Sequence, residues 1–170
     1  MKTTPLLLLA AALCVAGCQS PPVNSNPARQ ADITVNYQDP DKFTDARDTA
    51  TGPTSQYYLE LLTKHIQETA AERLTAGQKL NITFTDIDLA GDIPPGSIHD
   101  VRIIKAIYIP RMELHFQLTN AAGAVLKEGD RHLADLNFQM NLTANLDRND
   151  PLLYDKQMLT DWINREFPRP

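Results

Sequence analysis

The sequence predicts an α+β fold in which an antiparallel sheet, in the element order β-α-β-β-β-α, carries two helices packed on one face. Two observations support this fold class. Apolar and polar residues alternate in several runs, as in residues 112–118, and this pattern is typical of half-buried strands. Residues 55–74 and 152–167 instead repeat apolar residues every three or four positions, which is typical of helices that cover a core. The other face of the sheet is expected to carry polar side chains.

The amino terminus has the features of a secretory signal peptide. Lys2 supplies a positive charge, residues 6–15 form an unbroken apolar run, and the small residues Ala16 and Gly17 follow. A transmembrane helix needs about 20 apolar residues, so this run is too short to span a bilayer. The sequence therefore predicts that residues 1–17 are a signal peptide and are removed.

Cys18 stands directly after this predicted signal. The segment Val15-Ala16-Gly17-Cys18 resembles the lipobox of bacterial lipoproteins, which implies that Cys18 receives fatty acyl chains such as palmitate and begins the mature protein. More than one acyl chain makes a membrane anchor stable. An ordinary secreted protein with a cysteine at its cleavage site is the alternative interpretation.

The residues after Cys18 bear on location and domain organisation. In Gram-negative lipoproteins an Asp at the next position retains the protein in the inner membrane, so Gln19 implies an outer-membrane anchor that faces the periplasm. Residues 18–31 are rich in Pro, Ser and Asn and lack apolar periodicity, which predicts a flexible tether. Residues 32–170 are then expected to form a single domain.

Charge and cysteine content exclude several partners and reactions. The net charge of −5 becomes about −6 when residues 1–17 are removed, because they contain Lys2 and no acidic residue. This balance argues against nucleic acid as a partner and against a polybasic attachment to anionic lipid. Cys14 leaves with the signal and Cys18 is acylated, so the mature domain is predicted to have neither a disulfide nor a cysteine nucleophile.

The first half of the domain is predicted to contain a strand and a helix. Residues 32–37 alternate in polarity, and a turn-rich segment follows to residue 53. Thr54 or Ser55 is expected to cap a helix that runs to about residue 74, with Gly77 as its C-cap. Tyr58, Leu59, Leu62, Ile66 and Ala70 form its apolar face.

A second strand follows at residues 80–89. Its alternation changes phase after Phe84, because Ile87 and Leu89 are apolar where the first half of the run is polar. A phase change within a strand predicts a β-bulge, here near Thr85 and Asp86.

The second half is predicted to contain a hairpin and a helix. Residues 101–120 read as one strand bent at Pro110, and residues 124–142 read as its return, broken near Gly129. Asp150 and Pro151 are then expected to begin a helix over residues 152–167. The apolar stripe of this helix contains Tyr154, Met158, Leu159, Trp162 and Ile163.

The candidate chemistry lies at the end of the second strand. Asp86 and Asp88 share one face of the strand and Asp92 follows, and such carboxylates bind divalent cations or act as acid and base. A solvated strand end is the structural alternative, and Asp86 would then accept backbone N–H groups at the bulge. Arg111 is expected to pair with a carboxylate such as Asp86 or Asp135.

Other motifs for chemistry are missing from the sequence. His65, His99, His115 and His132 do not have the spacing of zinc ligands, and no P-loop, G-x-S-x-G or G-x-G-x-x-G segment occurs. An EF-hand loop that started at Asp39 would place Thr44 and Ala50 where Gly and Glu are required. The sequence therefore predicts no cofactor and favours a non-enzymatic function without settling it.

Four segments of the mature chain together resemble a family of bacterial secreted proteins known as domain of unknown function 3016. These are residues 39–45, residues 85–91, the pair 110–111 with 133–135, and residues 154–159 with 161–162. The resemblance covers nearly the whole domain and differs at Asp155, where the family pattern has Glu. It implies one domain and a location in the cell envelope, and it brings no activity or catalytic residues.

Three hypotheses on function follow. The first is a non-enzymatic binding or adaptor domain of an envelope lipoprotein, whose partners are the membrane and an envelope protein. The second is a metal-dependent or acid/base hydrolase that uses Asp86 and Asp88. The third is a structural role in an envelope assembly, in which a partner strand adds to the edge of the sheet.

Overall fold

The computed structural model describes residues 31–169 except 97–99 and 141–148. The predicted signal peptide, Cys18 and nearly all of the predicted tether lie outside the described residues. The elements are β1 (Asp32–Tyr37), a short 3-10 turn η2 (Pro40–Lys42), α1 (Gln56–Ala71), β2 (Lys79–Asp88), β3 (Arg111–Thr119), β4 (Val125–Ala134) and α2 (Leu153–Glu166). The predicted order of strands and helices is confirmed.

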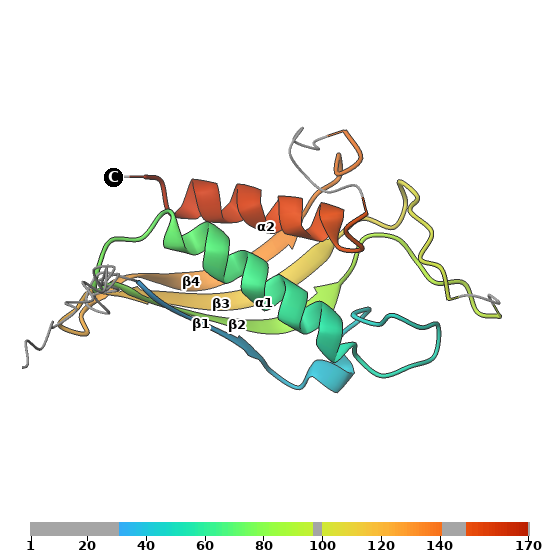
Figure 1. The fold of residues 1–170 in the computed structure, drawn as a ribbon, viewed down its shortest axis with the longest axis horizontal. Helices are drawn as coiled ribbons and strands as arrows, with labels where there is room; N and C mark the ends of the chain where they lie inside the picture. Colours follow the sequence, from blue (N-terminus) through green and yellow to red (C-terminus); the bar gives the residue numbers. More distant parts are fainter. Residues whose placement is uncertain (1–30, 97–99, 141–148, 170) are drawn as a thin grey trace, which may run out of the picture.

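The strands form one sheet in the order β1-β2-β3-β4 (Figure 1). β2, β3 and β4 pair antiparallel, as predicted, while β1 pairs parallel with β2. The parallel pair arises because α1 carries the chain back to the end of the sheet from which β1 started, as a crossover helix does. The α+β fold class is confirmed, with one parallel pair in a mainly antiparallel sheet.

Both helices cover the same face of the sheet (Figure 1). The core lies between the two layers, because apolar side chains from the strands meet those of the helices there. Its fully buried members include Leu62, Ile66, Leu80, Ile82, Phe84, Ile87, Met112, Phe116 and Leu159. These are largely the residues whose periodicity predicted the elements.

The other face of the sheet carries polar side chains that pair across the strands, as expected. These pairs are Asp32 with Lys79, Asp88 with Arg111, Glu113 with His132, His115 with Asp130, and Gln117 with Glu128. In each pair the two residues stand directly opposite each other on adjacent strands. Cross-strand pairs of this kind stabilise a sheet by about 0.2–1 kcal/mol each.

α1 begins where the sequence predicted and ends earlier. The Ser55 hydroxyl caps the helix by accepting the Tyr58 N–H at 3.4 Å, and it donates to Asp48 at 2.8 Å. The helix ends at Ala71, so Gly77 is not its C-cap. Gly77 instead has a φ of 82° in the turn that leads into β2, where a left-handed conformation favours glycine.

The predicted bulge in β2 is confirmed. The register with β3 shifts between Phe84 and Asp86. Phe84 and Ile87 are both fully buried, although residues three positions apart in a regular strand point to opposite faces. The extra residue allows this, because a bulge changes the face to which the following side chains point.

The predicted strand over residues 101–110 is wrong. β3 starts at Arg111, and the connection from Leu89 to Pro110 contains only a single bridge between Asp92 and Ile103 in its described part. Arg111 pairs with Asp88, the last residue of β2, so the residues before Arg111 have no neighbouring strand to extend along. Pro110 also lacks the N–H that a central strand would need.

The return strand differs from the prediction in two ways. β4 runs through Gly129 without a break, and it ends at Ala134 instead of residue 142. Ala134 pairs with Arg111, the first residue of β3, so no partner remains for a longer strand. Residues 136–140 form a turn although their polarity alternates, and residues 141–142 lie outside the described residues.

α2 starts one residue later than predicted. The Asp150 carboxylate accepts the Leu152 N–H at 2.9 Å, and the carbonyl of Asp150 accepts the Leu153 N–H at 3.2 Å. Asp150 therefore closes the turn that leads into the helix, while Leu152 is the N-cap residue. Leu159, Trp162 and Ile163 of the predicted stripe are buried.

Different connecting segments lie at the two ends of the domain. We call one the hairpin end: Asp32, residues 72–78, the β3–β4 turn at 120–124 and residues 167–169 lie there (Figure 1). We call the other the loop end, where the connections before α1, between β2 and β3, and before α2 lie (Figure 1). Both helices begin at the loop end and run toward the hairpin end. Within the described residues, no helix combines the length and apolar character that crossing a membrane requires.

Candidate functional site

Asp86 is held by the loop that follows β1. Its two carboxylate oxygens accept the Thr44 backbone N–H at 2.7 Å and the Thr44 hydroxyl at 2.8 Å. A carboxylate at a bulge that accepts a backbone N–H is the structural role that the sequence left open for Asp86. Both oxygens are therefore occupied by bonds within the protein.

Asp88 pairs with Arg111. The guanidinium of Arg111 donates to the Asp88 carboxylate at 3.1 Å, so the partner of Arg111 is the carboxylate two residues beyond Asp86. Burial raises the pKa of Asp88, and the hydrogen bond and charge of Arg111 oppose that rise. Asp135, the other predicted partner, accepts the Asn137 N–H at 2.9 Å through its side chain.

Asp86 and Asp88 line a shallow depression of about 240 Å³. Polar and apolar residues of β3 and β4 complete it: Arg111, Met112, Glu113, His132, Leu133 and Ala134, together with Thr44. Asp92 lies apart, in the bridge to Ile103, and borders a different depression with Asp45 and Arg47. Among the described residues no group of three or more His, Cys, Asp or Glu is arranged to hold a metal ion.

The described histidines form separate contacts. His115 and His132 face Asp130 and Glu113 across the β3–β4 pair, at 2.8 Å and 3.2 Å. His65 lies between the helices instead, where its Nε2 is 2.9 Å from the carbonyl oxygen of Lys156. Burial lowers the pKa of His65. His99 lies outside the described residues.

The sequence did not reveal the role of Arg102. Its guanidinium donates to both oxygens of Asp45, at 2.8 and 3.2 Å, and to the carbonyl oxygens of Gly91 at 3.1 Å and Arg47 at 2.8 Å. The Arg102 side chain is only 9% exposed. It thereby ties the loop after β1 to the connection between β2 and β3. Its Nε–H is buried and has no hydrogen-bond partner among the described residues.

Asp155 is the other buried charged group that periodicity could not identify. It lies in the first turn of α2 and its carboxylate accepts the Ala90 N–H at 3.0 Å. Burial raises the pKa of Asp155 to about 7, while the bond from Ala90 and the charge of Arg102 oppose that rise. Asp155 therefore titrates near neutral pH and connects α2 to the end of β2.

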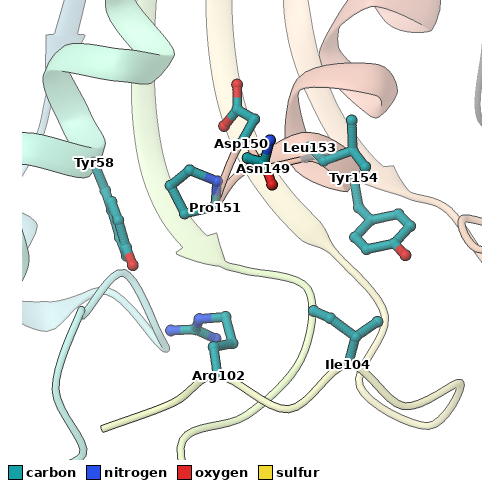
Figure 2. Close-up of a pocket in the computed structure, with 8 residues that line it drawn as sticks. All are labelled: Tyr58, Arg102, Ile104, Asn149, Asp150, Pro151, Leu153 and Tyr154. Carbon is teal, nitrogen blue, oxygen red and sulfur yellow. The ribbon is translucent and has the colours of Figure 1, made fainter. Parts of the chain in front are cut away.

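A pocket of about 390 Å³ opens beside these groups at the loop end. Its walls come from three parts of the chain that are distant in sequence: Tyr58 of α1, Arg102 and Ile104 of the β2–β3 connection, and Asn149, Asp150, Pro151, Leu153 and Tyr154 at the start of α2 (Figure 2). The hydroxyl of Tyr58 points toward the side of the pocket where Arg102 lies (Figure 2). The lining combines aromatic and aliphatic surface with a few polar groups, as small-molecule sites do.

The position of this pocket follows from the fold. The first turns of α1 and α2 both border it, so the positive ends of two helix dipoles lie at the same place. Asp150 also lines the pocket, but its carboxylate pairs with Lys156. The pocket therefore lies beside two helix N-termini and the Arg102 guanidinium.

Among known proteins, the chain matches a sequence family. The sequence model of the family described as protein of unknown function (DUF3016) matches residues 31–165. No curated protein and no solved structure matches the chain. The family match covers most of the chain and agrees with the resemblance seen in the sequence. The chain belongs to the DUF3016 family of proteins of unknown function.

Proposed function

We propose that this protein is an envelope lipoprotein whose domain is a non-enzymatic binding or adaptor module. Cys18 carries the acyl chains, which anchor the protein in the outer membrane so that the domain faces the periplasm. The pattern Val15-Ala16-Gly17-Cys18 after an apolar run supports the anchor. The observation that carries the binding function is the pocket at the loop end, which lies away from the point where the chain enters the domain.

The composition of the pocket supports binding more than catalysis. Tyr58, Ile104 and Leu153 offer apolar surface, and Arg102, which also lines the pocket, contributes a positively charged guanidinium. The ligand is therefore expected to bring an acceptor oxygen together with an apolar part.

The anchor is tested by changing Cys18. Cys18→Ala is expected to move the protein from the membrane fraction to the soluble fraction of the envelope, because no acyl chain is attached. Ser25→Ala, a change of similar size in the predicted tether, is the matched control and is expected to stay in the membrane fraction. Unchanged membrane attachment of Cys18→Ala would reject the proposed anchor.

The binding pocket is tested with a photoreactive residue in living cells. At position 104 the probe lines the pocket, whereas at position 107 it stands on the exposed part of the same connection, where Ile107 is 73% exposed. The proposal expects a specific adduct, detected by intact mass, from position 104 and not from position 107. The same adducts from both positions, or none from position 104, would count against a ligand in this pocket.

A hydrolase that uses Asp86 and Asp88 is the second candidate. The depression that both carboxylates line and the raised pKa of Asp88 favour it. The bonds from Thr44 and Arg111 disfavour it, because a metal ion or substrate would have to displace them. Calorimetry of the full chain with Ca²⁺, Mg²⁺ and Zn²⁺ decides the metal-dependent form: heat of binding that disappears in Asp88→Asn would support it.

Addition of a partner strand to the sheet edge has the least support. The two edge strands are β1 and β4. β4 carries charged residues along most of its length, at Lys127, Glu128, Asp130 and Arg131, and charged edge strands resist pairing with other chains. On β1, the side chain of Gln67 already donates to the carbonyl oxygen of Ile33 at 3.2 Å.

A further inference from the structure

The hairpin end carries an apolar groove of about 340 Å³. It lies between the end of α1, the end of α2 and the β3–β4 hairpin. Its apolar lining consists of Leu74, Leu118, Leu126, Phe167 and Pro168. Beside it, Val125 and Leu126 are 50% and 52% exposed. This end of the domain therefore presents apolar side chains to its surroundings.

The same end has an excess of positive charge. Together with the residues that flank it, this end comprises residues 31–32, 71–79, 118–127 and 165–169, which contain five Lys or Arg residues and three Asp or Glu residues, whereas the whole chain has a net charge of −5. The ten residues of β2 span roughly 33 Å along the sheet. The Debye length in physiological salt is about 8 Å. A charged surface next to the hairpin end therefore interacts mainly with the Lys and Arg side chains at that end. The excess of acidic residues in the rest of the chain is largely screened from it.

Two cations border the groove itself. Arg73 and Lys127 both line it. The Nζ of Lys127 lies 2.7 Å from Glu166 and 5.9 Å from the centre of the Phe167 ring. The groove thus combines apolar surface with a basic rim, as segments that lie on an anionic membrane surface do.

The chain enters the domain at this end. β1, which begins with Asp32, starts at the hairpin end (Figure 1). Ala31 is thirteen positions after Cys18 in the sequence, and a fully extended segment of that length reaches roughly 45 Å at most. Of the two ends of the domain, the hairpin end is the one that the anchor holds closest to the membrane.

We infer that the hairpin end docks on the phospholipid surface that holds the anchor. This inference rests on the proposed acylation of Cys18. Val125, Leu126 and the groove contact lipid, and Arg73 and Lys127 face anionic headgroups. Docking in this orientation leaves the pocket at the loop end open to the periplasm.

The test uses the full acylated protein, recovered from cells and placed in vesicles of phosphatidylethanolamine with or without phosphatidylglycerol. Acylation occupies the thiol of Cys18, so Val125→Cys introduces one free thiol for a fluorophore that responds to polarity. Ile107→Cys, at the loop end, is the matched control, because Ile107 is also exposed. Lipids that carry a nitroxide quencher report contact with the bilayer.

The label at position 125 is expected to lose fluorescence to the lipid-borne quencher, while the label at position 107 keeps it. The loss is expected to be larger with phosphatidylglycerol and smaller at high salt. Equal quenching at the two positions would overturn the inference. Fluorescence at position 125 that changes with the number of protein molecules per vesicle, and not with lipid composition, would overturn it as well. That result would indicate contact between copies of the chain.

A further variant and a flotation assay separate the docking from the anchor. Leu126→Asp on the Val125→Cys background is expected to reduce quenching, while the protein still floats with the vesicles. Flotation without quenching at position 125 rejects the docking and leaves the anchor in place. Failure to float rejects both, because the docking depends on the anchor.

Discussion

Replacement of Asp155 by Asn tests the buried network at the start of α2. The carboxylate is buried and accepts the Ala90 N–H at 3.0 Å. Asn has the same shape and keeps an acceptor oxygen for that bond, but it has no charge to bury. The substitution therefore isolates the effect of ionisation from the effect of packing.

The expected change in the free energy of unfolding follows from the pKa of Asp155. Burial raises it from 3.8 to about 7 in the folded protein, so the folded state holds the proton more tightly than the unfolded state. The contribution to stability is complete below about pH 4 and is lost as the pH rises through 7. At about 1.4 kcal/mol for each pH unit, the loss over this range is on the order of 4 kcal/mol.

The assay is urea unfolding of the wild type and Asp155→Asn at several pH values between 4 and 8. The free energy of unfolding of the wild type, relative to that of the variant, is expected to fall by up to about 4 kcal/mol across this range. Asp41→Asn, which removes one charge from an exposed position, is the control. If the wild type and Asp155→Asn show parallel pH profiles, Asp155 does not titrate near neutral pH and the reasoning is refuted.

Three other substitutions, one of them with a control, test the fold. Arg102→Ala is expected to lower the free energy of unfolding by about 3–5 kcal/mol, because it breaks a largely buried ion pair and leaves Asp45 with only the more distant Arg47, at 3.6 Å. Lys42→Ala breaks an exposed pair and should cost less than about 1 kcal/mol in the same urea titration. Leu62→Ala is expected to cost about 2–5 kcal/mol, since the side chain is fully buried, and a thermal melt checks this. The hydrogen bond from Arg131 lowers the pKa of Glu166 to about 2, so Glu166 contributes stability above about pH 4.5 that is lost as the pH falls toward 2. Glu166→Gln should therefore show a weaker loss of stability in acid, and an unchanged acid transition would contradict this assignment.

Local patterns predicted the elements well where one face of a strand or helix packs on the core. The alternation of Met112, Leu114, Phe116 and Leu118 became β3, because each of these side chains points toward the helices. The phase change after Phe84 likewise predicted the bulge in β2. Periodicity succeeds here because it records burial on one side.

The same signal failed where no neighbouring strand was present. Leu136, Phe138 and Met140 alternate with polar residues, yet only Phe138 is buried, while Leu136 is 78% and Met140 86% exposed. Phe138 packs on Tyr154, with ring centres 4.9 Å apart, in a small cluster outside the main core. Alternation alone cannot show whether a partner strand exists.

The candidate site was the least predictable part. The sequence singled out Asp86, Asp88 and Arg111, and the structure brings them to one depression. The pocket at the loop end instead depends on contacts such as that between Arg102 and Asp45, which are 57 residues apart. No local pattern records such a contact. The sequence did place Asp150 and Pro151 at the start of the second helix, but no pattern showed that they line a pocket with Arg102.

The central claim is that Cys18 is acylated and holds the domain at the membrane. Intact-mass measurement of the protein recovered from cells tests it most directly. We expect a mature chain that begins at Cys18 and is heavier than its amino-acid sequence by the mass of its acyl chains. An unmodified chain, or one that still carries residues 1–17, would contradict it.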